Sequence, residues 1–260
     1  MENQEILQET KDVFADHPME VKVRTKKMMM WLVILAVVML FAGVTSAVMV
    51  LYGKLLWVQI VPPTIFWVGN TLVVISSLTM IWAVRALKSG NSKMALAGVI
   101  TTFVLGLAFV FTQNKAWNQM TGMGFGRTET QTEQGTKSRW NTLGELQGQY
   151  GTDYTFTMNG QVLEKDGDKF LYTKADGSKE DKSLEVKTTF NASGAMLSIL
   201  VYLHIAHLFL GILYLMVNVV RIIKGKLNQN DWISLYSNGM YWHFMGILWL
   251  YLFAFLFFIY

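Results

Sequence analysis

Apolar residues are gathered into five long stretches that contain no Asp, Glu, Lys or Arg. These stretches cover residues 28–53, 55–84, 94–114, 188–220 and 232–260. A helix needs about 20 apolar residues to cross a hydrocarbon core of roughly 30 Å. The pattern therefore predicts five membrane-spanning helices. The second is expected near 64–87, because Pro62 and Pro63 belong to its entry.

The polar segment 115–190 is too long to be a simple connection between helices. Its Asn159-Gly160, Asp166-Gly167 and Asp176-Gly177 pairs supply the positive φ values of tight turns. Alternating runs such as 154–158 and 184–186 predict a small antiparallel sheet of three or four strands, whereas 121–151 is expected to be irregular.

The fold class expected is thus an all-α polytopic membrane helix bundle with a small inserted antiparallel β domain outside the membrane. The expected domains are 1–27, an N-terminal segment; 28–114, helices one to three; 115–190, the insert; and 191–260, helices four and five. Within the N-terminal segment, Ile6, Leu7, Val13 and Phe14 suit either a weak amphipathic turn or a solvated tail.

The net charge of +4 comes from short loops rather than from one basic patch. Basic residues cluster at 85–93 and 221–226, while Lys54 stands alone at the opposite side of the bundle. By the positive-inside rule, the N-terminus is cytoplasmic, and the insert and the C-terminus are periplasmic. Nucleic-acid binding has little support, and the lack of cysteine excludes disulfides and thiolate metal sites.

Histidine is the only ionisable residue placed well inside the spans. A small transporter or proton channel is disfavoured, because such proteins normally keep a charged group within the bilayer. His204 and His207 are three residues apart, and with His243 they could supply three ligands to a metal or a haem iron. Without a nearby carboxylate or cysteine that site would be poor, so the histidines are interpreted chiefly as packing residues.

Small and hydroxyl residues recur in the second span and indicate close helix contacts. Ser76 and Ser77 suit hydrogen bonding between helices. Asn70 is an amide deep enough in the span to require a partner. These three residues are expected to be structural contacts, as is Tyr241 in the last span.

Motifs in all five predicted spans resemble those of a known family, and the most specific pair lies in the last two spans. The fifth span reads Tyr241-Trp242-His243-Phe244 followed by Trp249-Leu250, and the fourth reads His204-Ile205-Ala206-His207. Arg221 lies 20 residues before Tyr241. This arrangement resembles subunit III of the haem-copper oxidases, best known from cytochrome c oxidase, in its five-helix bacterial form.

The resemblance implies an accessory subunit with no catalytic residue, cofactor or metal site of its own. Haem and copper would lie in the partner catalytic subunits I and II, and this chain would stabilise the complex in the bacterial inner (cytoplasmic) membrane and hold phospholipid. The lipid-binding residues expected from the resemblance are Arg221, His204, His207, Trp242 and His243. The alternatives are subunit III of a quinol oxidase and an accessory subunit of nitric oxide reductase.

Two features depart from the family pattern. Its acidic positions are occupied here by Val37, Ala116, Tyr236 and Gly246, so no proton-handling role that rests on those carboxylates is carried over. The insert is much longer than the usual connection. One hypothesis is that 115–190 docks a second respiratory complex in a supercomplex, and the other is that it braces neighbouring subunits or is a solvated decoration.

Overall fold

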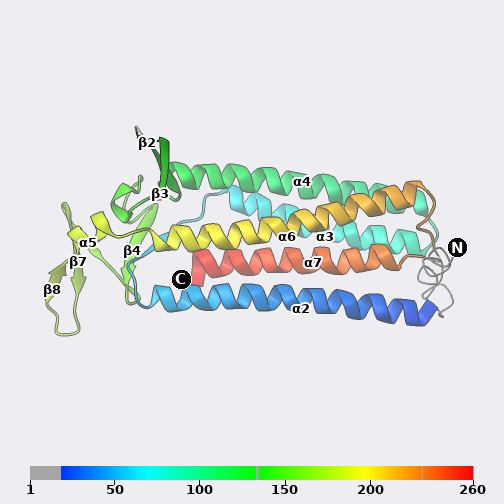
Figure 1. Ribbon diagram of the computed structural model, residues 1–260, viewed down its shortest axis with the longest axis horizontal. Helices are drawn as coiled ribbons and strands as arrows, with labels where there is room; N and C mark the ends of the chain where they lie inside the picture. Colours follow the sequence, from blue (N-terminus) through cyan, green and yellow to red (C-terminus); the bar gives the residue numbers. More distant parts are fainter. Residues whose placement is uncertain (1–18, 133–134, 230, 260) are drawn as a thin grey trace.

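The computed structural model describes residues 19–132, 135–229 and 231–259, and it contains five helices long and apolar enough to cross a membrane. The expected amphipathic turn near Ile6 lies outside the described residues. The long helices are α2 (Met19–Tyr52), α3 (Ile65–Lys88), α4 (Ser92–Gly122), α6 (Ala192–Ile223) and α7 (Ile233–Ala254), and α7 runs on into η2 (Phe255–Ile259). The predicted class, a helix bundle with small antiparallel sheets in a connecting segment, is confirmed (Figure 1).

Several helices are longer than the apolar stretches that predicted them, because their polar end turns stay helical outside the hydrocarbon region. Asn91 caps α4, since its side-chain oxygen accepts a hydrogen bond of 3.1 Å from the Met94 amide. Asn191 caps α6 in the same way, at 2.9 Å from the Gly194 amide. These caps satisfy amide groups that the first turn of a helix leaves unpaired.

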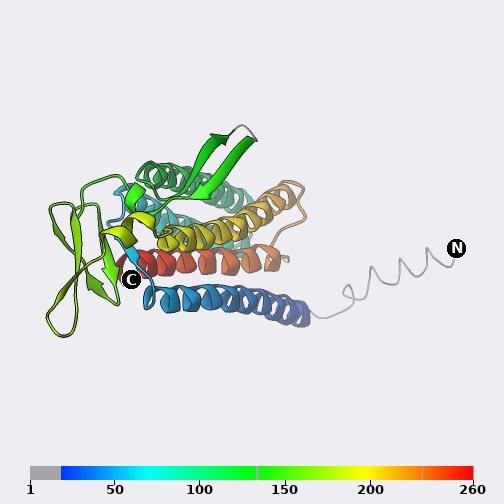
Figure 2. The same ribbon diagram turned by 60° about the vertical axis from the view of Figure 1, so that its left-hand side comes forward.

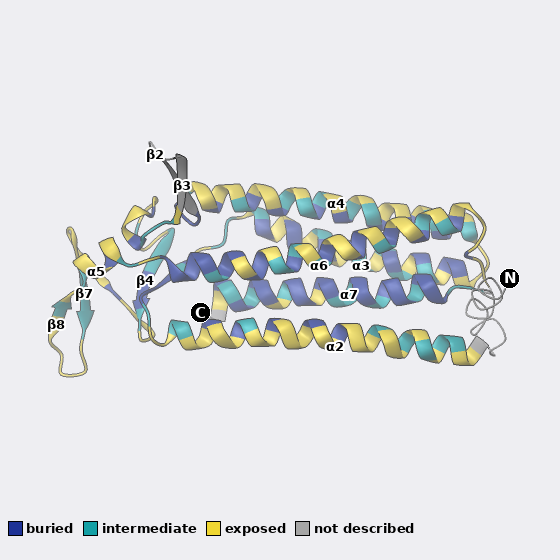
Figure 3. Cartoon of the chain, viewed as in Figure 1, coloured by how far each residue is buried: buried dark blue, intermediate teal, exposed yellow. Residues whose placement is uncertain are grey.

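Helix α7 lies in the middle of the bundle and packs against α2, α3 and α6, while α4 covers α3 and α6. Figure 3 shows α7 mostly buried, whereas α2 is exposed along much of its length. The α3–α4 contact is the most extensive. The two helices approach closely because Gly98 has no side chain; a Cβ atom built there would lie 2.7 Å from the Ala83 Cβ. Thr79 and Thr102 share a hydrogen bond of 2.8 Å across the same contact.

The two ends of the bundle differ in what they carry. The strands and η2 gather at one end, and the start of α2 lies at the other with the α3–α4 and α6–α7 loops (Figure 1). This arrangement agrees with the expected grouping of loops and termini. The assignment of the loop end to the cytoplasm remains a prediction, as does the division of the chain into domains.

The strand β1 (Trp57–Ile60) was not expected from the sequence, which assigned no element to these residues. β1 pairs antiparallel with β4 (Tyr154–Met158), and Trp57 lies opposite Thr157. β4 continues through the Asn159-Gly160 turn into β5 (Gln161–Val162), and both turn residues have positive φ. The insert is therefore paired with the connection between the first two membrane helices.

The rest of the insert also differs in part from expectation. Residues 121–151, expected to be irregular, contain a hairpin of β2 (Arg127–Thr132) and β3 (Gly135–Trp140), which stands apart from the other strands (Figure 2). The run 184–186, expected as a strand, lies in α5 (Ser183–Thr188). Three further strands form an outer sheet: β6 (Glu164–Asp166), β7 (Lys169–Thr173) and β8 (Lys179–Asp181). A short 3-10 turn, η1 (Leu143–Glu145), precedes β4.

Candidate functional site

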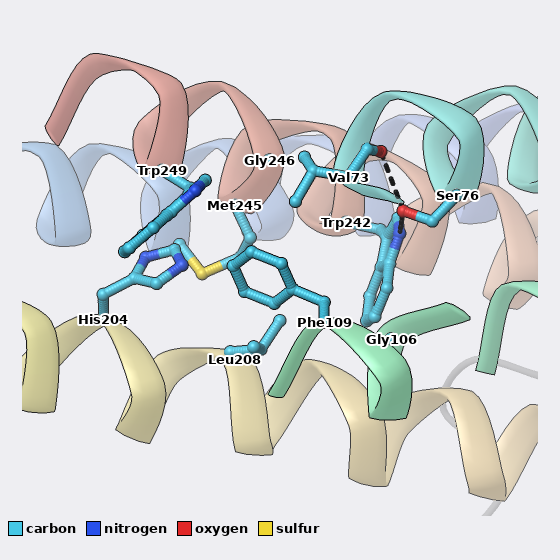
Figure 4. Close-up of a pocket in the computed structure, with 10 residues that line it drawn as sticks. All are labelled: Val73, Ser76, Gly106, Phe109, His204, Leu208, Trp242, Met245, Gly246 and Trp249. Carbon is cyan, nitrogen blue, oxygen red and sulfur yellow. Dashed lines mark hydrogen bonds between the residues drawn. The ribbon is translucent and has the colours of Figure 1, made fainter. Parts of the chain in front are cut away.

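Helices α3, α4, α6 and α7 enclose a small cavity of about 20 Å³ in the core of the bundle. Figure 4 shows its lining, in which α7 supplies two indole rings. The Trp242 indole donates a hydrogen bond of 3.1 Å to the Ser76 hydroxyl, and Ser76 in turn donates to the Val73 carbonyl. Trp242 fits there because Gly106 of α4 has no side chain; a Cβ atom at that position would lie 2.7 Å from the indole.

Trp249 makes the matching contact at the other end of the cavity. Its indole donates a hydrogen bond of 2.9 Å to the Asn70 side-chain oxygen, and both residues are buried. The ring also lies beside His204, with 5.3 Å between the ring centres. Trp249 and Trp242 therefore tie α7 to α3 through two buried hydrogen bonds, each across the bundle core.

His204 and His207 face different neighbours, although they lie only three residues apart. His204 is almost fully buried, and its Nδ1 atom forms no hydrogen bond with any described residue. His207 is half-buried and lies 5.7 Å from the Phe41 ring of α2, while its Nδ1 contacts the Leu203 carbonyl at 2.7 Å. The Tyr241 hydroxyl donates to the His207 carbonyl at 2.9 Å, so Tyr241 links α7 to α6.

Arg221 belongs to a polar network at the loop end of α6 and α7. Its guanidinium donates to the Ser234 hydroxyl at 2.7 Å and lies 3.4 Å from the Asp231 carboxylate. Ser234 donates to the Asn218 side chain at 3.0 Å, and the Tyr214 hydroxyl donates to the Ser234 carbonyl. About a third of the Arg221 side chain stays exposed.

No metal site emerges among the described residues. Within 19–132, 135–229 and 231–259, no group of three or more His, Asp or Glu side chains lies close enough to hold an ion. The three histidines of the spans are therefore not brought together. His243 instead lines a separate groove between α3 and α7, on the face of α7 away from the central cavity.

The sequence matches one known family over its C-terminal part. The model of the family described as Cytochrome c oxidase subunit III matches residues 183–260. Residues 183–260 are therefore similar to that subunit. The subunit III match includes α6 and α7, and thus both histidines of the fourth span and the Tyr-Trp-His-Phe run. Together with five apolar helices, it makes the chain a multi-pass membrane protein.

Of the residues expected to bind lipid, only some are accessible. His204 and Trp242 are buried inside the bundle, whereas Arg221, His207 and His243 are partly exposed. Asn218 and Ser234 were not singled out from the sequence. Asn218 could have been, because it is an amide within an apolar stretch and lies one helical turn before Arg221.

Proposed function

We propose that this chain is an accessory subunit of a respiratory haem-copper terminal oxidase, which stabilises the catalytic subunit and holds phospholipid. The observation that carries the proposal is the subunit III match over residues 183–260. The expected partners are subunits I and II, which would hold the haem and copper. The chain itself would supply packing surface and lipid contacts in a bacterial inner membrane, with its N-terminus cytoplasmic.

The use of the family's signature residues supports a structural role. The indole groups of Trp242 and Trp249 and the hydroxyl of Tyr241 donate hydrogen bonds to other helices of this same chain. Such bonds contribute about 0.5 to 2 kcal/mol each between membrane helices. Polar groups engaged in this way hold helices in register, which suits a subunit that presents a rigid surface to a partner.

Lipid binding at Arg221 forms the second part of the proposal. The guanidinium lies at a helix end, where a phospholipid phosphate would be found, and a guanidinium forms paired contacts with phosphate oxygens. Ser234 and Asp231 orient it from one side. His207 and His243 are accessible enough to contribute, whereas His204 and Trp242 would act through the packing of the helices.

The insert supports a further part of the proposal, that it docks a second respiratory complex. Its outer sheet projects beyond the bundle, and most residues of β6 and β8 are exposed (Figure 1). By contrast, β4 is fixed to the bundle through β1, whose Val58 amide donates to the Ser193 hydroxyl of α6 at 3.3 Å. An exposed outer sheet that follows a sheet fixed to the bundle suits the recognition of a partner.

Purification of the tagged chain from its native membranes tests the main proposal. We expect haem absorption and copper to elute with it, and untagged membranes taken through the same column give the background. Elution of the chain without a haem-containing partner would rule out the oxidase assignment. Reduction of the purified complex by cytochrome c or by a quinol then separates a cytochrome c oxidase from a quinol oxidase.

A further inference from the structure

A groove of about 260 Å³ lies between α3 and α7 near the loop end of the bundle, away from Arg221. Apolar side chains and a glycine form most of its wall, and basic and aromatic groups lie toward the loop end. Its lining residues are Ile81, Val84, Arg85, Lys88, Tyr236, Gly239, Met240 and His243. No carboxylate lines it among the described residues.

Two cations lie over aromatic side chains at the mouth of this groove, and a third cation, Arg85, lines it. The Lys88 ammonium lies 3.8 Å from the centre of the Trp232 ring and 5.0 Å from that of Tyr236. Lys27, from α2, lies 5.1 Å from the same Tyr236 ring. Arg85 is one turn before Lys88 on α3, so it lies on the same face.

These three side chains form no ion pair with any carboxylate in the part of the chain that the structure describes. Arg221, by contrast, is close to Asp231. Arg85 and Lys88 lie in the last turn of α3, where basic residues interact favourably with the helix dipole, so the dipole explains part of their placement. It does not account for Lys27, which comes from a different helix and reaches the same ring.

The groove begins where the apolar stretches end. Arg85 and Lys88 belong to the last turn of α3, and Lys27 directly precedes the apolar stretch of α2. The apolar part of the wall, with Ile81 and Val84, lies further along α3. Basic pockets between membrane helices on the cytoplasmic side suit acidic lipid headgroups, since the phosphate meets the cations and the acyl chain meets the apolar wall.

We propose that the α3–α7 groove binds one acidic glycerophospholipid, its phosphate held by Arg85, Lys88 and Lys27 and its upper acyl chain lying along Ile81, Val84 and Met240. This inference rests on the proposed lipid-holding function and adds a site to it. Tyr236 supports the site because its ring lies against the ammonium groups of both Lys27 and Lys88.

Native mass spectrometry of the purified complex tests the site. The double variant Arg85→Gln/Lys88→Gln is compared with Lys93→Gln/Lys224→Gln, which removes the same charge at the same end without touching the groove. After delipidation, each protein is titrated with phosphatidylglycerol or phosphatidylcholine. We expect the groove variant to bind phosphatidylglycerol roughly tenfold to thirtyfold more weakly at one site, and the control to match the wild type.

Three outcomes would overturn the inference: equal affinity in the groove variant, equal weakening in both variants, or equally tight phosphatidylcholine binding by the wild type. Displacement of the lipid by millimolar inorganic phosphate alone would also overturn it, because the acyl chain would then contribute nothing. The measurement is independent of haem content, so a failure of the oxidase assignment would be seen separately. Assembly of both variants with their partners confirms that they fold.

Discussion

At the residue scale, single buried hydrogen bonds between α7 and α3 contribute to the free energy of unfolding. Trp249→Phe removes the indole donor and leaves the Asn70 oxygen buried without its partner. We expect the free energy of unfolding to fall by about 1 to 3 kcal/mol, measured by denaturation in detergent micelles.

Trp82→Phe is the matched control for that change, because Trp82 is exposed on the same helix, α3, as Asn70. It should alter stability by less than about 0.5 kcal/mol. In the double variant Asn70→Ala/Trp249→Phe, the loss should be smaller than the sum of the single losses. Strict additivity would show that the two side chains do not interact.

Tyr150 provides a residue-scale prediction within the insert. Its hydroxyl donates a hydrogen bond of 2.6 Å to the Leu163 carbonyl, and burial raises the pKa of this phenol above its ordinary value. The folded state therefore favours the neutral form. This stabilising contribution is complete below about pH 10 and is lost as the pH rises through the folded-state pKa.

Tyr150→Phe tests that prediction. At neutral pH the variant should lose about 1 kcal/mol from the stability of the insert. Above about pH 10 the stability of the variant should depend less on pH than that of the wild type. In an alkaline titration followed by tyrosinate absorbance, one component that titrates at high pH should disappear. An unchanged alkaline titration would contradict the assignment of the shift to Tyr150.

At the scale of elements, the close approach of α3 and α4 is expected to contribute to the stability of the bundle. Gly98→Ala places a Cβ atom 2.7 Å from that of Ala83, so α3 and α4 must move apart. We expect a loss of about 1 to 3 kcal/mol in the free energy of unfolding, as for other overpacked contacts. Loss of the Thr79–Thr102 hydrogen bond would accompany the separation.

Gly43→Ala is the control for this helix contact, because nothing lies within 4 Å of a Cβ atom at Gly43. There the higher helix propensity of alanine acts alone, and stability should stay the same or rise by up to about 1 kcal/mol. Equal effects of the two substitutions would show that the α3–α4 contact is looser than the structure describes.

The element scale also shows why sequence reasoning succeeded for the helices and failed for some strands. Apolar stretches mark membrane helices directly, so α3 was expected at 64–87 and spans Ile65–Lys88. The β1 strand has no such signal, because its four residues continue an apolar stretch and their partner lies about a hundred residues later. The β2–β3 hairpin is too polar to show the alternation that marks a half-buried strand.

Removal of the outer sheet is an experiment at the scale of the whole molecule. Glu164 and Asp181 both lie opposite Leu171, on either side of β7. They are thus about 10 Å apart, a gap that a four-residue Gly-Ser linker can replace. Deleting 164–181 in this way keeps every residue of the β1–β4 pair and of the bundle, but it removes the Phe170 ring that packs on Tyr150 and Phe156.

We expect the shortened chain to assemble with the oxidase but to lose any larger respiratory assembly, as measured on native gels in a mild detergent. A full-length chain prepared in parallel provides the reference. If the shortened chain still forms the same larger assembly, the docking proposal is contradicted. Loss of the oxidase itself would show that the outer sheet braces neighbouring subunits.

At this largest scale the sequence predicted the five membrane-spanning helices found among the described residues and the grouping of their ends. It also showed a family resemblance over all five spans, of which residues 183–260 match the family model. It did not predict which side chains share the core. His204 and His207 appear equivalent along the sequence, yet one faces Trp249 and the other Phe41. Their neighbours depend on how α2 and α7 pack around α6, and helix periodicity alone does not determine that packing.

The pairing of β1 with β4 also imposes an order on biosynthesis. Trp57 and Thr157 are separated by 100 residues of chain. At roughly 5 to 20 residues per second, the ribosome adds β4 on the order of 5 to 20 s after β1. During that interval β1, which follows α2, lacks its partner, so closure of the sheet is a late step that fastens α2 to the helices made after it.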